Sequence, residues 1–197
     1  MPRTAAANEA VKARTRARVM EHALKLFSLH GYDATSVKMI ADSCGMAQGL
    51  LYRHFKGKEH LLRAIFEQSM ADVQASFSLA QQSEDPLDRI EALIRGAASI
   101  VTGHRRFWKL SYGVRMQQGA LKALGPRLSS WTRTIESTLH GYLKQAGARH
   151  PRLEAAILFA TIDGMSQHYV LDPENYPLTD VVDAVVQQYR QRLGRKK

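Results

Sequence analysis

Residues 35–55 read TSVKMIADSCGMAQGLLYRHF, and this stretch decides the fold because it predicts two short helical segments joined by a tight turn. Thr35 or Ser36 is suited to cap the first segment, and Ala41 is small where two crossing helices would touch. Gly45 follows four residues later, and glycine adopts the positive φ of a tight turn without a Cβ penalty. The pattern is typical of a helix-turn-helix, although a buried helical hairpin has the same Ala-x-x-x-Gly spacing.

The second segment has one apolar side and one polar side. Met46 and Leu51 are apolar where this segment would lean on the first, so its other side is free to reach a DNA groove. Gln48 suits bidentate pairing with adenine, and Gly49 permits close approach to the groove wall. The spacing therefore indicates a recognition helix.

The rest of the chain shows helical periodicity, and no run alternates apolar and polar residues long enough to predict a strand. We expect an all-α protein with about nine helices. Besides a short helix that ends before Gly45, the expected segments are 11–30, 48–55, 58–80, 87–102, 104–118, 126–146, 152–171 and 178–193.

Charge is distributed unevenly along the 197 residues, whose formal net charge is +10. Residues 1–66 contain 11 Lys or Arg and 5 Asp or Glu, whereas residues 67–189 contain 12 and 13. The last eight residues add five basic and no acidic side chains. This asymmetry indicates a DNA-facing head on a body with another role.

Other classes of protein lack support in the sequence. No uninterrupted apolar run of about 18 residues predicts a membrane span, and Cys44 as the single cysteine excludes an intrachain disulfide. Gly-x-Gly-x-x-Gly and Gly-x-Ser-x-Gly are absent, and no two of the eight histidines have His-x-x-x-His spacing. We predict no catalytic, cofactor or metal site. The alternatives are a nonspecific nucleic-acid-binding protein and, behind it, an all-α enzyme.

From Arg16 to Leu61 the chain resembles the N-terminal domain of the TetR family of bacterial transcriptional regulators. The run from Leu51 to Phe55, followed by Lys58, is the most specific part of the match. The other matching residues are Val19, Ala23, Leu26, Phe27, Gly31, Tyr32, Thr35, Ser36, Ile40, Ala41, Gly45, Gly49 and Leu61.

The resemblance implies a cytoplasmic, ligand-responsive regulator, a repressor that a small molecule releases from a palindromic operator in double-stranded DNA. It implies a flexible basic arm (1–10), a DNA-binding domain (11–57), a ligand-binding and dimerisation domain (58–194) and a basic tail (195–197). The DNA-contacting residues would be Ser36, Lys38, Gln48, Gly49, Leu50, Tyr52, Arg53, His54 and Lys58. Ala47 departs from the hydroxyl residue often found at its position.

Two further sites are expected in the body. Ala156, Ala160 and Gly164 recur every four residues and would let another helix approach closely. The resemblance implies that they form a homodimer interface with Val182, Val186 and Tyr189 of the last helix. It also implies a ligand pocket, for which the candidate residues are His104, Trp108, Tyr112, Arg115, Met116, Trp131, Ile135, Asp163 and His168. A plain apolar core is the alternative for the pocket set, and packing within one chain is the alternative for the interface residues.

Overall fold

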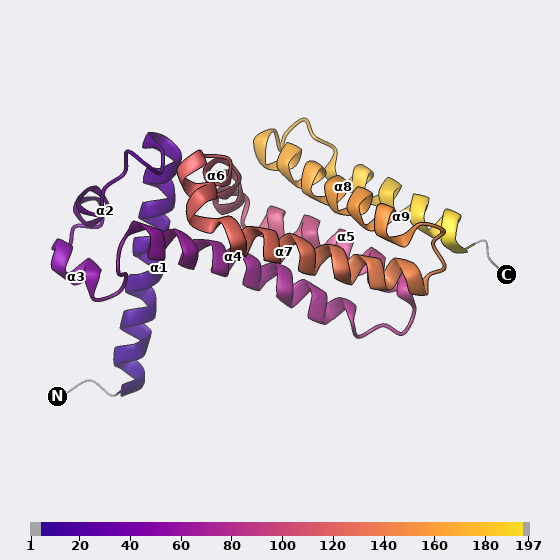
Figure 1. The fold of residues 1–197 in the computed structure, drawn as a ribbon, viewed down its shortest axis with the longest axis horizontal. Coiled ribbons are helices and arrows are strands. Elements are labelled where there is room, and N and C mark those ends of the chain that lie inside the picture. Colours follow the sequence, from indigo (N-terminus) through magenta and orange to yellow (C-terminus); the bar gives the residue numbers. More distant parts are fainter. Residues whose placement is uncertain (1–4, 195–197) are drawn as a thin grey trace. The chain divides into compact units, whose positions relative to one another are not determined.

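The computed structural model describes residues 5–194, which form nine helices and no strand (Figure 1). This confirms the all-α prediction. The helices are α1 (Ala5–His30), α2 (Val37–Ser43), α3 (Gln48–Tyr52), α4 (Lys58–Ala80), α5 (Pro86–Gly103), α6 (Arg105–Arg115), α7 (Gln118–Gln145), α8 (Pro151–Leu171) and α9 (Leu178–Gly194). Within these described residues, no helix is long and apolar enough to cross a membrane.

The chain divides into two compact units whose boundaries differ from the expected domains. The first unit contains the residues up to Gln68 together with Leu110–Gly125. The second contains Ser69–Lys109 together with the residues from Pro126 onward. The start of α4 and the link between α6 and α7 therefore belong to the unit that carries the helix-turn-helix.

Helix α1 begins earlier than expected and ends where expected. It starts at Ala5, so residues 5–10 of the expected flexible arm are helical, in keeping with their alanine content. Residues 1–4 lie outside the described residues, as does the expected basic tail at 195–197. At the other end, Gly31 has φ +88° and donates its N–H to the carbonyl oxygen of Phe27 at 3.1 Å.

The core of the first unit is assembled from α1 to α4 and from the segment Leu110–Gly125. Helices α1 to α4 meet through large side chains that are almost completely buried. Val114, Ala120 and Leu124 of the later segment are equally buried. The buried side chains of α1 to α4 include Val19, Phe27, Ile40, Leu51, Leu61 and Ile65.

In the second unit, α5 packs against both α8 and α9, and Figure 1 shows α8 and α9 side by side. Asp85 caps α5 by accepting the Leu87 N–H at 2.8 Å. Two arginines also tie α5 to α9: Arg190 donates to Asp88 at 2.5 Å and to Glu91 at 2.6 Å, and Arg95 of α5 forms an ion pair with Asp183 of α9 at 2.8 Å. The hydrogen bond from Arg95, followed by that from Arg190, keeps the pKa of the Glu91 carboxyl below its usual range.

Helix α7 corrects one predicted boundary. Pro126 was expected to begin this helix, because proline is favoured in a first turn. The helix instead starts at Gln118 and contains Pro126 in its interior, where the proline ring has no N–H for the helical hydrogen bond. Ala120 and Leu124 lie in the added turns and are fully buried, so tertiary packing offsets the lost bond.

Candidate functional site

The helix-turn-helix is built from local hydrogen bonds that the sequence predicts. Ser36 is the N-cap of α2, and its hydroxyl accepts the Met39 N–H at 3.1 Å. Gly45 has φ +62°, and the following Met46 donates its N–H to the Ala41 carbonyl oxygen at 3.0 Å. Helix α3 is shorter than the expected 48–55, and its N-cap residue, Ala47, provides no side-chain cap.

Burial decides which side of the motif faces solvent. Ile40 and Ala41 of α2 and Leu51 of α3 are almost completely buried, as is Phe55 just beyond α3. These four side chains hold the two short helices on α1 and α4 through the apolar core of the first unit. The opposite side of α2 and α3 is therefore directed to solvent.

Seven of the nine predicted DNA-contacting residues lie exposed on this outer side. Leu50 and Tyr52 retain 41% and 49% of their accessible surface, which is high for apolar and aromatic side chains. The exposed residues are Ser36, Lys38, Gln48, Gly49, Leu50, Tyr52 and Arg53. We call this set the outer face. Its donors, acceptors and aromatic ring match the groups that bind phosphates and base edges.

Lys38 has an intramolecular partner on the outer face. Its ammonium donates to the Asp42 carboxylate at 2.9 Å, one helical turn along α2, and both side chains are highly exposed. An exposed ion pair of this kind contributes little stability, about 0.3–0.5 kcal/mol. The lysine remains free to exchange this carboxylate for a phosphate.

His54 is half-buried, and its Nδ1 is buried with no hydrogen-bond partner. Burial, followed by the charges of Arg16 and Lys12, lowers the pKa of the His54 imidazole. The ring is therefore neutral near pH 7. A neutral, half-buried ring is a weaker candidate for a phosphate contact than the exposed residues beside it.

Lys58 is also half-buried and already makes contacts inside the protein. Its ammonium donates to the carbonyl oxygens of Tyr32 at 3.0 Å and Asp33 at 2.9 Å, and it lies 4.7 Å from the centre of the Tyr32 ring. An ammonium has three N–H donors, so one remains for a phosphate. Lys58 thus supports the turn after α1, a role that its sequence position did not predict.

Arg16 is a positioning residue that the sequence reasoning missed. From α1 it donates a hydrogen bond of 2.6 Å to the carbonyl oxygen of His54, directly after α3. This carbonyl belongs to the end of a short helix, where backbone acceptors lack intrahelical partners. Arg16 stands at the start of the family resemblance, but the partners are 38 positions apart in sequence, so no local pattern reveals the contact.

The family model for bacterial regulatory proteins of the tetR family matches residues 19–65, which contain the whole helix-turn-helix. These residues therefore form a DNA-binding domain of the TetR family. The HTH-type transcriptional regulator AcrR of Shigella flexneri is 29% identical over 178 residues, a match that covers 83% of this chain and 82% of AcrR. The chain is accordingly a DNA-binding transcriptional regulator rather than an enzyme.

Solved structures share the fold at low sequence identity. The fatty acid degradation regulator FadR of Bacillus halodurans has a TM-score of 0.72 and 19% identity, and the match covers 93% of this chain and 96% of FadR. AibR in complex with isovaleryl coenzyme A and operator DNA has a TM-score of 0.68 and 22% identity, covering 88% and 97%. These likenesses establish that the TetR-like fold extends well beyond residues 19–65.

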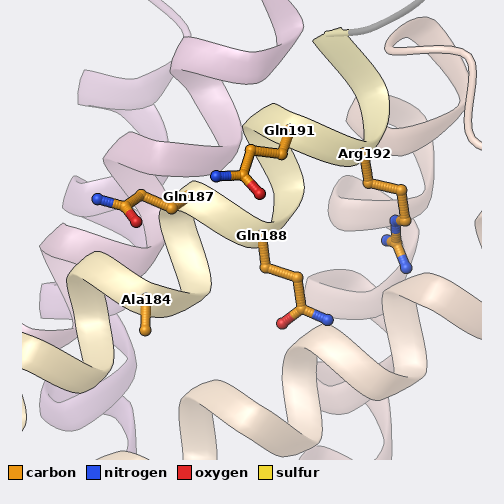
Figure 2. Close-up of a pocket in the computed structure, with 5 residues that line it drawn as sticks. All are labelled: Ala184, Gln187, Gln188, Gln191 and Arg192. Carbon is orange, nitrogen blue, oxygen red and sulfur yellow. The ribbon is translucent and has the colours of Figure 1, made fainter.

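The α9 residues of the expected dimer interface are buried in the single chain. Val182, Val186 and Tyr189 are buried within the chain itself, where Val186 and Tyr189 face Ile90 and Ile94 of α5. These residues form an apolar face of α9, as its periodicity predicts, and a role for them between chains stays a prediction. The solvent-facing side of α9 is instead polar and borders a hollow (Figure 2). Ala184, Gln187, Gln188, Gln191 and Arg192 line this hollow, and Figure 2 shows Gln187 and Gln191 extending to one side of α9 and Gln188 and Arg192 to another.

On α8 the predicted residues are accessible. Ala156 and Ala160 are exposed, and a Cβ added to Gly164 would meet no atom within 4 Å. Two large apolar side chains on the same helix, Leu153 and Ile157, keep 60% and 52% of their surface exposed. We call these five residues the α8 stripe.

The predicted pocket residues occupy different environments. Trp108 is buried and packs edge-to-face against Phe107, with ring centres 6.1 Å apart. Arg115 lies over the Tyr112 ring at 4.5 Å, and Asp163 accepts a hydrogen bond of 2.7 Å from Gln167. Trp131 and Ile135 are half-buried, whereas His104 and His168 are exposed.

Met116 differs from the other pocket candidates in that 79% of its surface is exposed. The hollow on α9 and two others, at the start of α4 and between α5 and α9, are not lined by any of the nine pocket residues. A ligand site at these nine residues stays a prediction. In residues 5–194, no group of three His, Cys, Asp or Glu side chains is arranged to hold a metal ion.

Proposed function

We propose that this chain is a sequence-specific repressor that binds a palindromic operator in the bacterial cytoplasm and is released by a small molecule. The observation that supports this most directly is the outer face of the helix-turn-helix. Four buried side chains fix the inner side of α2 and α3, which leaves seven residues with DNA-binding chemistry on one exposed side. Because packing already fixes the backbone of α2 and α3, little backbone conformational entropy is lost when the outer face binds DNA.

The proposed roles on the outer face follow from side-chain chemistry. Gln48 at the start of α3 reads a base edge, since its amide both donates and accepts. Leu50 makes an apolar contact, for which the thymine methyl group is the natural partner in the major groove. Tyr52, Arg53 and Ser36 bind phosphates and set the register, together with the remaining donor of Lys58.

We further propose that the chain is a homodimer held through the α8 stripe. Leu153 and Ile157 expose apolar surface, and Ala156, Ala160 and Gly164 provide a shallow track against which a second helix can pack closely. The polar outer side of α9 would flank this contact in place of Val182, Val186 and Tyr189. Two-fold symmetry would present two copies of α3 to two half-sites of a palindrome.

The proposed effector is a small apolar molecule with an anionic or polar end. AibR, which shares the fold, is described with isovaleryl coenzyme A and operator DNA, an acyl thioester joined to an anionic carrier. In this chain, α6 combines Trp108 and Tyr112 with the basic residues Arg105, Arg106, Lys109 and Arg115. Quenching of Trp108 fluorescence by acyl thioesters or apolar carboxylates, with release of bound DNA, would support this assignment.

The decisive experiment is selection of bound sequences from random duplex DNA with the full chain. We expect an enriched palindrome whose half-sites are about one helical turn apart, or a multiple of it, and footprinting should then protect both half-sites. A palindrome establishes operator binding and dimer geometry together. Failure to enrich any sequence would instead favour nonspecific binding through charge alone, which the near-neutral charge of residues 67–189 opposes.

A further inference from the structure

Gln117 joins two segments of the first unit that are far apart in sequence. It lies in the short link between α6 and α7. Its side-chain Nε2 donates to the carbonyl oxygen of Phe27 at 3.1 Å, and its Oε1 accepts the N–H of Tyr32 at 2.6 Å. One side-chain amide thus binds the residues on both sides of the turn at Gly31. Phe27 is 90 positions and Tyr32 is 85 positions from Gln117 in sequence.

The Tyr32 N–H is a donor that local structure does not satisfy. Gly31 follows the last residue of α1 and has a left-handed backbone conformation. Its own N–H donates to the Phe27 carbonyl oxygen. Tyr32 is buried, so its backbone N–H cannot bind water and needs an acceptor from another segment of the chain. A side-chain amide is well suited to this position, because it supplies an acceptor for Tyr32 and a second donor for Phe27.

The same turn is held from other directions. The Thr35 hydroxyl donates to the Gly31 carbonyl at 2.7 Å, and Lys58 donates to the carbonyls of Tyr32 and Asp33. The Asp33 carboxylate lies so close to Gly119, in the first turn of α7, that a Cβ there would overlap it. The N-terminal end of a helix favours a carboxylate. The α6–α7 link and the first turn of α7 therefore lie against this turn, through Gln117 and Gly119 respectively.

We propose that Gln117 is a positioning residue for DNA binding. The turn Gly31–Thr35 leads directly into Ser36, the N-cap of α2, so its conformation sets where the helix-turn-helix begins. Gln117 acts through Tyr32 and touches no DNA itself. The inference rests on the proposed operator binding, and it places residues 110–125 in the functional DNA-binding unit rather than only in the body.

The test uses the full chain with Gln117→Met, which keeps length and removes both polar groups. Gln118→Met is the matched control, because Gln118 is the next residue and its side chain is exposed. We would measure the affinity of each protein for two duplexes, the one selected by the wild-type protein and a scrambled one. Each affinity is corrected for the fraction of active protein, which stoichiometric titration gives. Amide exchange of Tyr32 is followed in parallel.

For Gln117→Met we expect about tenfold weaker binding to the selected duplex, as for a lost hydrogen bond that leaves a buried partner unsatisfied. Binding to the scrambled duplex should change by less than about twofold, because it depends on charge rather than on the placement of α2 and α3. The ratio of the two affinities should therefore fall. Exchange of the Tyr32 amide should accelerate while the amides of α9 keep their rates.

Gly119→Ala tests the same turn with Gln117 intact. Its Cβ pushes the Asp33 carboxylate aside, and we expect a smaller loss of binding to the selected duplex in the same direction. The proposal is overturned if Gln117→Met keeps the wild-type ratio of affinities for the selected and scrambled duplexes. It is also overturned if the affinities for both duplexes fall by the same factor and that factor matches the fraction of unfolded protein. If the unchanged protein selects no sequence, the proposed operator binding itself fails, whereas Tyr32 exchange still reports the hydrogen bond.

Discussion

The guanidinium carbon of Arg16 lies 4.3 Å from the centre of the Phe55 ring, so one side chain of α1 covers the buried residue that follows the recognition helix. The same guanidinium donates to the His54 carbonyl oxygen. A cation over an aromatic face and a hydrogen bond to a helix-end carbonyl together fix where α3 ends relative to α1. This arrangement leads to the first prediction.

Arg16→Met should lower the free energy of unfolding by about 2 kcal/mol, because a hydrogen bond from a charged donor and a cation–π contact are both lost. Chemical denaturation measures the change. Arg14→Met, at an exposed position on the same helix, is the control and should leave stability within about 0.5 kcal/mol of wild type. Equal effects of the two substitutions would show that the Arg16 contact contributes nothing.

Gln48→Ala should reduce discrimination between the selected duplex and its single-base variants by about 1–3 kcal/mol at one position of each half-site, as expected for a bidentate base contact. Tyr52→Phe, which removes only a hydroxyl, should weaken binding to all duplexes to a similar extent. Binding is compared by titration at fixed salt concentration. If Gln48→Ala preserves the full sequence preference, α3 does not read bases through this residue.

Lys58→Met should affect both folding and DNA binding. The carbonyls of Tyr32 and Asp33 lose a charged donor, so the melting temperature should fall. If its third N–H binds a phosphate as proposed, the slope of log affinity against log salt should become less steep by about 0.9. An unchanged slope in a folded variant would restrict Lys58 to its role inside the protein.

Ala160→Arg should convert the proposed dimer to monomers of 22.1 kDa, because a long charged side chain in the α8 stripe would be buried without a partner. Operator affinity should fall steeply with it, since two half-sites are no longer bound together. Ala75→Arg, at an exposed position on α4, is the matched control. Light scattering reports the mass, and a stable dimer of the Ala160 variant would remove the stripe from the interface.

The stability of the first unit should decrease as the pH falls below about 6.5, the ordinary pKa of histidine. In the folded state, burial and the charges of Arg16 and Lys12 lower the pKa of His54, so the unfolded chain takes up the proton more readily. The stabilising contribution is thus present above pH 6.5 and is lost below it. Denaturation between pH 7.5 and 5.5 should show a smaller pH dependence for His54→Gln than for wild type, and an equal dependence would contradict the prediction.

The sequence by itself determined the helix-turn-helix and its exposed side. Ser36 as a cap, Gly45 at a positive φ and the apolar spacing around Leu51 are all local features, and local hydrogen bonds and helical periodicity decide their structure. The same periodicity predicted an all-α chain and most helix bounds. It also placed small residues on the side of α8 that proves to be accessible.

Only the tertiary structure decided what covers each apolar face. Val186 and Tyr189 lie on an apolar face that the sequence predicts, and the tertiary structure places them beside Ile90 and Ile94 of α5. Packing also carries α7 through Pro126, against the local preference of proline. Gln117 shows the physical reason most clearly, because its partners Phe27 and Tyr32 lie 90 and 85 residues away. Periodicity reveals that a face will be buried, whereas chain segments distant in sequence determine its partner.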